Sequence, residues 1–165
     1  MAYIRKDYYE GLYGEISERD FSMLSWEAER VINLHTTGID GVRKLKVAFP
    51  TDEDAAEAIK RCAAKIVNFL YRVILEETAI SSISGFTETE QGIHGKVISS
   101  ITAGNESISY STATNTASEV TAAAKDHKVR DKVVSDIVWE HLSGVEDANG
   151  VNLLFMGNYP RRFVC

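Results

Sequence analysis

The chain has 165 residues, of which 18 are Lys or Arg and 24 are Asp or Glu, so its formal net charge is −6 at pH 7. This length is typical of one domain, and we expect a single domain over residues 1–165. An acidic chain opposes tight wrapping of a phosphate backbone, which disfavours a conventional DNA-binding module. Apolar residues make up 44% of the chain and it has 2 prolines, a composition typical of a folded helical protein.

Apolar residues recur at spacings of three and four over most of the chain and predict its helices. We expect a short helix or turn over residues 7–13 and helices over 17–37, 51–78 and 117–142. The apolar stripe of the helix over 17–37 consists of Phe21, Leu24, Ala28, Val31 and Ile32. Ser17 and Thr51 are the expected N-caps of the second and third helices, and Thr51 precedes three carboxylates that suit the positive end of a helix dipole. The stretch between these two helices is expected to be a loop or a short extended piece. The predicted fold class is therefore mainly α, a bundle of about four helices with core segments at about 5–78 and 117–144.

The segment 81–124 differs from the rest of the chain in composition. It has 16 Ser or Thr in 44 residues, a single Lys, and no Leu, Arg or Pro. Such a segment is unsuited to an ordinary leucine-lined core, so we expect a polar excursion over about 79–116. A turn at Gly104-Asn105 would make a β-hairpin that places Ile101 opposite Ile108 and Ser99 opposite Tyr110.

The last residues form a tail that is too apolar for a solvated terminus. A turn at residues 147–150 precedes this extended C-terminal tail, 151–165. Such a tail either folds back on its own core or docks on another chain. Arg161 and Arg162 are unbalanced by nearby acids, and we assign them to a partner. By contrast, the basic and acidic residues at 125–140 are expected to form i,i+4 pairs on an exposed helix face.

No motif of the chain predicts catalysis, a cofactor or a metal. Metal-ligand spacing is absent among the four histidines, His35, His94, His127 and His141. The run from Gly92 to Lys96 lacks the glycine spacing of a phosphate loop. His35 and His141 are expected near helix ends, where a cation complements the dipole. A nucleophile elbow is absent, and the paired acids are placed as helix caps or turn residues.

The start of the chain and its two cysteines indicate a compartment. No run reaches the roughly 18 apolar residues of a spanning helix, and residues 1–6 lack the apolar core of a signal peptide. We therefore expect a cytosolic chain with no membrane contact. Cys62 and Cys165 have neither metal nor disulfide spacing and are expected to be free thiols.

A long polar excursion and an apolar tail both lack an evident partner within the chain. Long excursions are uncommon in compact monomers and are usually functional. Copies of the chain arranged in a closed ring would cover both segments without leaving an open edge. Two other classes remain open at this point: a small helical DNA-binding or regulatory protein, and a small hydrolase using His94 with nearby Ser or Glu.

Four short motifs follow one another along the chain. They are Asp7-Tyr8-Tyr9 with Leu12-Tyr13-Gly14, Leu24-Ser25-Trp26-Glu27-Ala28, Ile98-Ser99-Ser100 with Ser107-Ile108-Ser109-Tyr110, and Leu153-Leu154-Phe155-Met156-Gly157. In this order they resemble the head-tail connector (adaptor, or head completion) proteins of long-tailed bacteriophages and related prophages. The resemblance covers most of the chain.

The resemblance implies a non-enzymatic virion protein at the head-tail interface, present in the host cytoplasm during assembly. Copies of the chain are expected to form a ring, taken as a dodecamer. The other expected partners are the portal protein above the ring and a tail-side stopper or tail completion protein below it. DNA would pass through the lumen without specific binding, which suits a segment with few positive charges. The expected subunit or lumen contacts are Ile101, Ile108, Tyr110, Ser99 and Asn105. The expected portal contacts are Leu154, Phe155, Met156, Tyr159, Arg161, Arg162 and Phe163.

Overall fold

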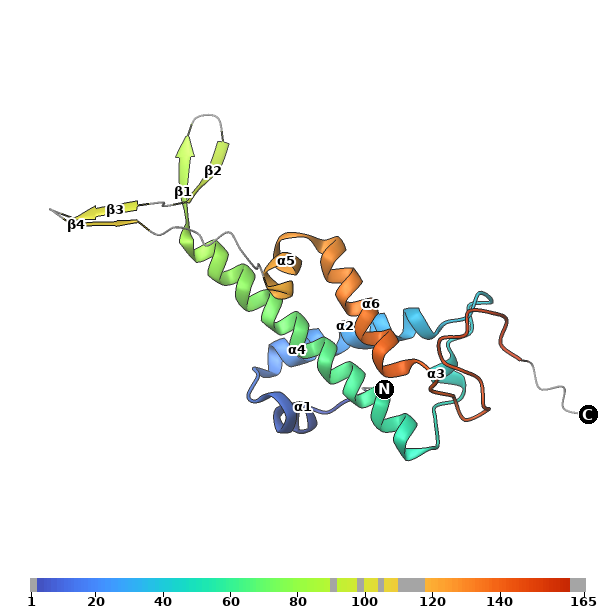
Figure 1. Ribbon diagram of the computed structural model, residues 1–165. Coiled ribbons are helices and arrows are strands. Elements are labelled where there is room, and N and C mark those ends of the chain that lie inside the picture. Colours follow the sequence, from blue (N-terminus) through green and yellow to red (C-terminus); the bar gives the residue numbers. More distant parts are fainter. Residues whose placement is uncertain (1–2, 90–91, 98–99, 104–105, 110–117, 161–165) are drawn as a thin grey trace, which may run out of the picture. The chain divides into compact units, whose positions relative to one another are not determined.

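The computed structural model describes residues 3–89, 92–97, 100–103, 106–109 and 118–160, and it describes side chains over 3–79 and 118–160. The chain is mainly helical, as predicted (Figure 1). The helices are α1 (Lys6–Tyr13), α2 (Glu18–Thr36), α3 (Lys44–Val47), α4 (Glu53–Ile83), α5 (Glu119–Lys125) and α6 (His127–Leu142). The described residues thus form six helices, where the sequence pattern predicted about four. The two additional helices are α3, in the expected loop, and α5, which is separate from α6.

The chain divides into two compact units. The first comprises Met1–Tyr71 and Asp131–Cys165, and the second comprises Arg72–Arg130. The first unit holds most of the large, fully buried side chains, which come from α1, α2, α4, α6 and the segment after α6. They include Tyr9, Ile32, Ile59, Ile66, Val67, Val138, Leu142 and Leu153.

Side chains at the helix ends explain where α1, α2 and α4 begin or stop. The Ser17 hydroxyl accepts a hydrogen bond from the Asp20 amide at 3.1 Å, which confirms Ser17 as the N-cap of α2. α1 ends at Gly14, whose φ of 92° suits a residue without a Cβ. The prediction that Thr51 caps α4 is wrong by one residue. The Asp52 carboxylate accepts from the Ala55 amide at 2.9 Å and so caps α4.

Asp126 separates α5 from α6, so the expected continuous helix over 117–142 is wrong. Its backbone is extended, with φ −137° and ψ 114°. Its carboxylate accepts a hydrogen bond from the Lys128 amide at 2.8 Å and satisfies a donor at the start of α6. A short acidic side chain that caps a helix in this way competes with helix continuation, which is the physical reason for the break.

Charged residues of α6 pair with α4 where pairs along one helix were expected. The Glu140 carboxylate lies 2.7 Å from the Lys65 ammonium group in the first unit. In the second unit the Arg130 guanidinium pairs with Glu77. The expectation of i,i+4 pairing is therefore wrong for Arg130 and Glu140, because acidic and basic side chains of α4 come within their reach.

The second unit also contains four short strands in two antiparallel pairs. β1 (Ser84–Thr89) pairs with β2 (Gly92–Val97), and β3 (Ser100–Ala103) pairs with β4 (Glu106–Ser109). In the second pair Ile101 lies opposite Ile108 in the backbone register. The expected turn at Gly104-Asn105 and the pairing of Ser99 with Tyr110 lie outside the described residues. Among the described helices, none is both long and apolar enough to cross a membrane.

Candidate interaction site

The segment that follows α6 turns back onto the first unit. The Asp147 carboxylate accepts hydrogen bonds from the amides of Asn149 at 2.8 Å and Val151 at 3.0 Å, which closes a turn. Leu153 is fully buried and Leu154 is 8% exposed. The sequence left open whether the tail folds back on its own core or docks on another chain. These two residues fold back on the core of their own chain. Leu154, an expected portal contact, lies in that core.

Lys44 of α3 anchors this segment from inside. Its side chain is fully buried. The ammonium group donates to the carbonyl oxygens of Leu153 at 2.8 Å and Asn152 at 3.2 Å, and also to that of Phe155. Three backbone acceptors thus match the three donors of an ammonium group, which is what a buried lysine needs. Burial lowers the pKa of Lys44, and the carboxylate of Asp147 opposes that change.

Tyr159 holds the end of the described segment in place. Its hydroxyl donates to the Asp147 carboxylate at 2.5 Å and accepts from the Asn149 side-chain amide at 2.7 Å. Its backbone amide donates to the Asp40 carboxylate at 2.8 Å. The polar groups of this expected portal contact are therefore engaged within the chain, and Tyr159 braces the segment.

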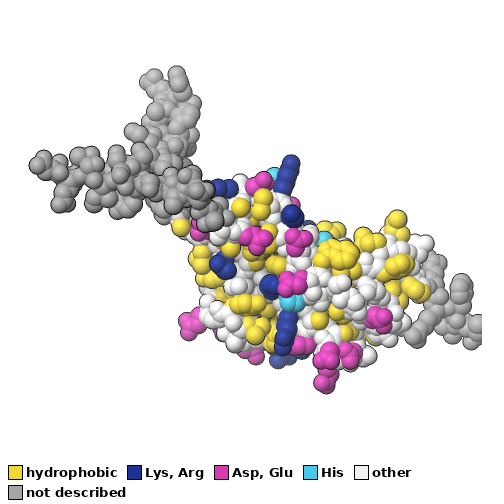
Figure 2. Space-filling view, viewed as in Figure 1, with side chains coloured by type: hydrophobic (Ala, Val, Ile, Leu, Met, Phe, Trp, Pro, Cys, Tyr) yellow, Lys and Arg dark blue, Asp and Glu magenta, His cyan; other side chains and the backbone are white. Residues whose placement is uncertain are grey.

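Between Leu154 and Tyr159 the anchored backbone presents large apolar side chains to solvent. Phe155 is 50% exposed and Met156 is 59% exposed. Ile39, which is 80% exposed, lies beside them because its amide donates to the Met156 carbonyl at 3.2 Å. We call Ile39, Phe155 and Met156 the end patch. Figure 2 shows apolar side chains on the side of the first unit where α3 and the C-terminal segment lie.

Gly157 shapes the end patch through a close approach. A Cβ atom at this position would come within 2.3 Å of the Phe155 ring. A side chain at this position would therefore force the Phe155 ring to move. The Phe155 ring in turn lies over Lys44, with its centroid 5.8 Å from the ammonium nitrogen. The orientation of Phe155 is thus set from two sides.

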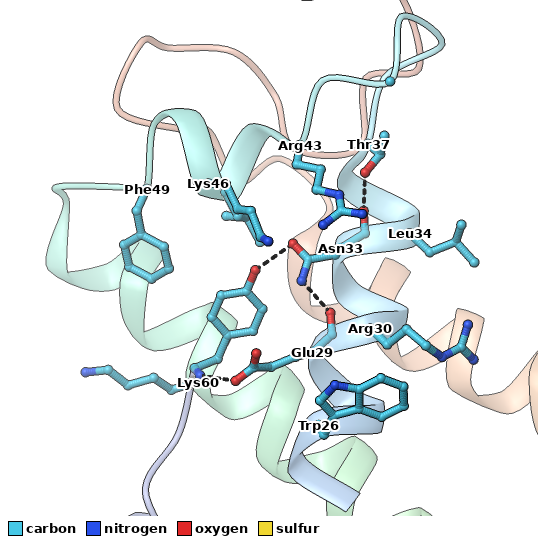
Figure 3. A pocket seen from close by; sticks show the side chains of 13 residues that line it. Trp26, Glu29, Arg30, Asn33, Leu34, Thr37, Arg43, Lys46, Phe49 and Lys60 are labelled. Atoms are coloured by element: carbon cyan, nitrogen blue, oxygen red, sulfur yellow. Dashed lines mark hydrogen bonds between the residues drawn. The ribbon is translucent and has the colours of Figure 1, made fainter. Parts of the chain in front are cut away.

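A concave feature of the first unit, of about 1120 Å³, lies along α2, α3 and the start of α4 (Figure 3). Tyr3 of the N-terminal segment is one of its lining residues. The Tyr3 hydroxyl donates to the Asn33 side-chain oxygen at 2.9 Å, and the Tyr3 amide donates to the Glu29 carboxylate at 3.0 Å. Burial, with a contribution from Glu29, raises the pKa of Tyr3 to about 12. Tyr3 also stacks on Phe49 at a centroid distance of 6.2 Å.

The walls of this feature combine cations with exposed apolar side chains. Four cations line it against one carboxylate, Glu29, and they are Arg30, Arg43, Lys46 and Lys60. Three large apolar side chains remain exposed there, namely Trp26 at 65%, Leu34 at 63% and Phe49 at 40%. We call this feature the basic groove. Arg30 pairs with Glu27 and Lys60 pairs with Glu57, so the groove owes its positive charge mainly to Arg43 and Lys46.

The structure brings some of the expected contact residues together and leaves others outside the described part. Phe155 and Met156 are neighbours in the end patch. Ile101 and Ile108 are opposite in backbone register, and their side chains lie outside the described residues. Outside the described residues also lie Ser99, Asn105, Tyr110, Arg161, Arg162 and Phe163.

Sequence reasoning missed Lys44 and the basic groove. Lys44 has no local signal, because the acceptors that bury it lie 108 to 111 residues further along the chain. The basic groove does have a local signal in the sequence. Trp26, Arg30 and Leu34 follow each other at a spacing of four on α2, outside the stripe that was assigned to the core, so they form an apolar and cationic stripe of their own.

The histidines of the first unit lie where the sequence placed them, but their burial disfavours the expected cation. His35 and His141 occupy the last turns of α2 and α6. Burial lowers the pKa of both side chains, which favours the neutral form over a cation at the helix end. His141 Nε2 is buried without a hydrogen-bond partner among the described residues.

The thiol of Cys62 is free, as predicted, and it is buried. Burial raises its pKa to about 12. Within the described ranges no group of three or more His, Cys, Asp or Glu side chains could hold a metal ion. Comparison of the chain with protein-family models, with curated proteins and with solved structures finds no match. The fold and the site define a mainly helical protein with an anchored apolar end patch and a basic groove.

Proposed function

We propose that this chain is a structural virion protein, a head-tail connector subunit that forms a homo-oligomeric ring below the portal protein and catalyses no reaction. The ring would extend the channel through which DNA leaves the head and join the head to a tail-side stopper. The motif order described above supports this proposal, because the resemblance spans both the helical core and the C-terminal segment.

The observation that carries the proposal is the end patch on its anchored backbone. Exposed aromatic and Met side chains that cluster on a fixed backbone are typical of the centre of a binding surface. Because Lys44 already holds the backbone, docking would cost little further ordering of Phe155 and Met156. The portal contact is therefore proposed at Ile39, Phe155 and Met156, continued by Arg161, Arg162 and Phe163.

The segment 81–124 supports the proposed channel through its charge. It carries one Lys among 44 residues, so it offers few sites for lasting phosphate contacts. A wall that lets DNA slide needs this property. We propose that Ile101, Ile108, Tyr110, Ser99 and Asn105 contact the lumen or the adjacent subunit.

Binding to the portal protein of the same virus tests the proposal. We expect the full chain to bind the portal ring and to appear as a ring itself by native mass spectrometry of the complex. The double variant F155S/M156S should bind at least tenfold more weakly. M23S, which removes another exposed Met at a site outside the end patch, is the matched control and should bind like the wild type.

Two results would overturn the proposal. One is a wild-type chain that binds no portal, and the other is salt-sensitive retention on duplex DNA in the absence of portal binding, which would favour a DNA-binding protein. Equal portal binding by F155S/M156S and the wild type would remove the end patch from the proposed contact.

A further inference from the structure

α1 and the turn that leads into α2 carry acidic and apolar residues on the surface. Residues 7–18 contain four acids and no Lys or Arg. Leu12 and Tyr13, in the middle of this stretch, are 52% and 43% exposed. We call residues 7–18 the acidic ridge.

The core holds the acidic ridge in position. Tyr9, on α1, is 1% exposed, and its ring lies 6.0 Å from that of Phe21 and 5.5 Å from that of Tyr13. This packing fixes the rotation of α1 and leaves Leu12 on the outside. Lys6, just before the ridge, pairs with Glu10 at 3.2 Å and with Glu18 at 3.7 Å, while Asp7 and Glu15 are exposed and form no ion pair with another described residue.

The basic groove has the complementary character. Arg43 and Lys46, on and beside α3, are exposed, and neither forms an ion pair with another described residue. Figure 3 shows Trp26 and Leu34 along the α2 side of the groove and Phe49 on the other side. Apolar surface of this kind needs an apolar partner, which a phosphate backbone does not provide and which Leu12 and Tyr13 do.

Within one chain, no carboxylate of the acidic ridge pairs with a cation of the groove among the described residues. Glu15 precedes the first residue of α2, and Arg43 and Lys46 follow its last residue. α2 has 19 residues, so its length of about 28 Å at 1.5 Å per residue separates Glu15 from these two cations. Two complementary surfaces that do not pair within one chain are suited to head-to-tail contact between copies, which generates a ring when the rotation closes.

We infer that the basic groove of one copy binds the acidic ridge of a second copy, with Leu12 and Tyr13 against Trp26, Leu34 and Phe49. Asp7 and Glu15 would lie near Arg43 and Lys46. This inference rests on the proposed ring and names a contact between its subunits that involves neither the expected β-hairpin nor the C-terminal tail.

Charge reversal on each side tests this contact with full chains in low salt. R43E/K46E places two acids in the groove opposite the acidic ridge, and D7K/E15K places two lysines on the ridge opposite the basic groove. Each variant alone should therefore self-associate at least tenfold more weakly than the wild type in sedimentation velocity. An equimolar mixture of the two should assemble again, because in an alternating ring the introduced lysines of one variant face the introduced glutamates of the other, and the second contact keeps the wild-type charges.

K128E/K132E is the matched control, since it makes the same charge change at two exposed lysines outside the groove. It should assemble like the wild type. Circular dichroism of every variant checks that the helices remain, and added salt should weaken the mixed assembly.

The outcomes separate this inference from the proposed function. If the wild type assembles and both reversed variants assemble equally well, the groove contact is wrong and the ring remains. If the mixture stays monomeric while the wild type assembles, the contact is also wrong. A wild type that stays monomeric both alone and with the portal overturns the ring and the contact together. Single-stranded DNA binding that R43E/K46E abolishes, without self-association of the wild type, would assign the groove to nucleic acid.

Discussion

The Lys44 ammonium group donates a hydrogen bond of 2.8 Å to the carbonyl oxygen of Leu153, a residue 109 positions away along the chain. Both side chains are fully buried. This contact joins α3 to the backbone that presents Phe155 and Met156. The stability of the first unit and the geometry of the end patch therefore depend on the same lysine.

Replacing Lys44 by Met should lower the free energy of unfolding by about 2–4 kcal/mol, because it leaves buried carbonyl groups without a donor. Urea unfolding followed by circular dichroism measures this change. K46M, on the same short helix but exposed, is the control and should change stability by less than about 0.5 kcal/mol. Equal effects of the two substitutions would show that the buried hydrogen bonds of Lys44 contribute little.

The protein should lose stability as the pH falls through the titration of His141. Burial and the nearby Lys65 and Arg61 lower the pKa of this side chain below its usual 6.5, while Glu140 opposes them. Between the lowered pKa and 6.5 the unfolded chain binds more protons than the folded chain. The free energy of unfolding therefore decreases as the pH falls through this window.

Urea midpoints between about pH 7.5 and pH 5 measure this pH dependence. H141Q should flatten it. H127Q, at a side chain that is 79% exposed, is the control and should keep the wild-type slope. Burial also lowers the pKa of His35, so the slope should decrease in H141Q without vanishing. A wild-type slope in H141Q would assign the pH dependence to other groups.

The Cys62 thiol should resist alkylation in the folded protein. A pKa raised from 9.0 to about 12 lowers the thiolate fraction near pH 8 about a thousandfold, and burial excludes the reagent as well. In a C165S variant, which leaves one thiol, iodoacetamide should modify Cys62 only as fast as the chain unfolds. Mass spectrometry of the intact protein gives the rate, with the same variant in urea as the reactive control. Rapid labelling in native buffer would contradict the burial of this thiol.

Removing the carboxylate of Asp126 should destabilise the start of α6. D126A loses the acceptor for the Lys128 amide and should cost about 1 kcal/mol, the usual effect of deleting an N-cap. D126N keeps a side-chain oxygen and should cost much less. Urea unfolding compares the two variants. If both were as stable as the wild type, the interruption between α5 and α6 would not depend on this cap.

The helices could be predicted largely from local sequence. The spacing of Phe21, Leu24, Ala28 and Ile32 predicted α2 and its buried face, and Ser17 predicted its start. These signals lie within a few residues of the structure that they determine, because helical periodicity and capping act over one or two turns. The same reasoning failed at Asp126, where one side chain interrupts an otherwise helical pattern.

The candidate site was predictable only in part. The apolar character of residues 153–156 marked the C-terminal segment as one that folds back on its own core or docks on another chain, but its two halves have opposite environments. Leu154 packs inside the chain and Phe155 lies outside it. No sequence pattern separates them, because the separation follows from the three carbonyl groups that turn toward Lys44.

By itself, the sequence determined the helical class, the free thiol of Cys62, and an apolar C-terminal segment. Only the tertiary structure decided that Lys44 is buried beneath that segment and that Trp26 and Leu34 stay exposed beside four cations. The physical reason is the distance along the sequence between the interacting residues. Periodicity and caps depend on neighbours along the chain, whereas the burial of a charge depends on acceptors that folding brings from more than 100 residues away.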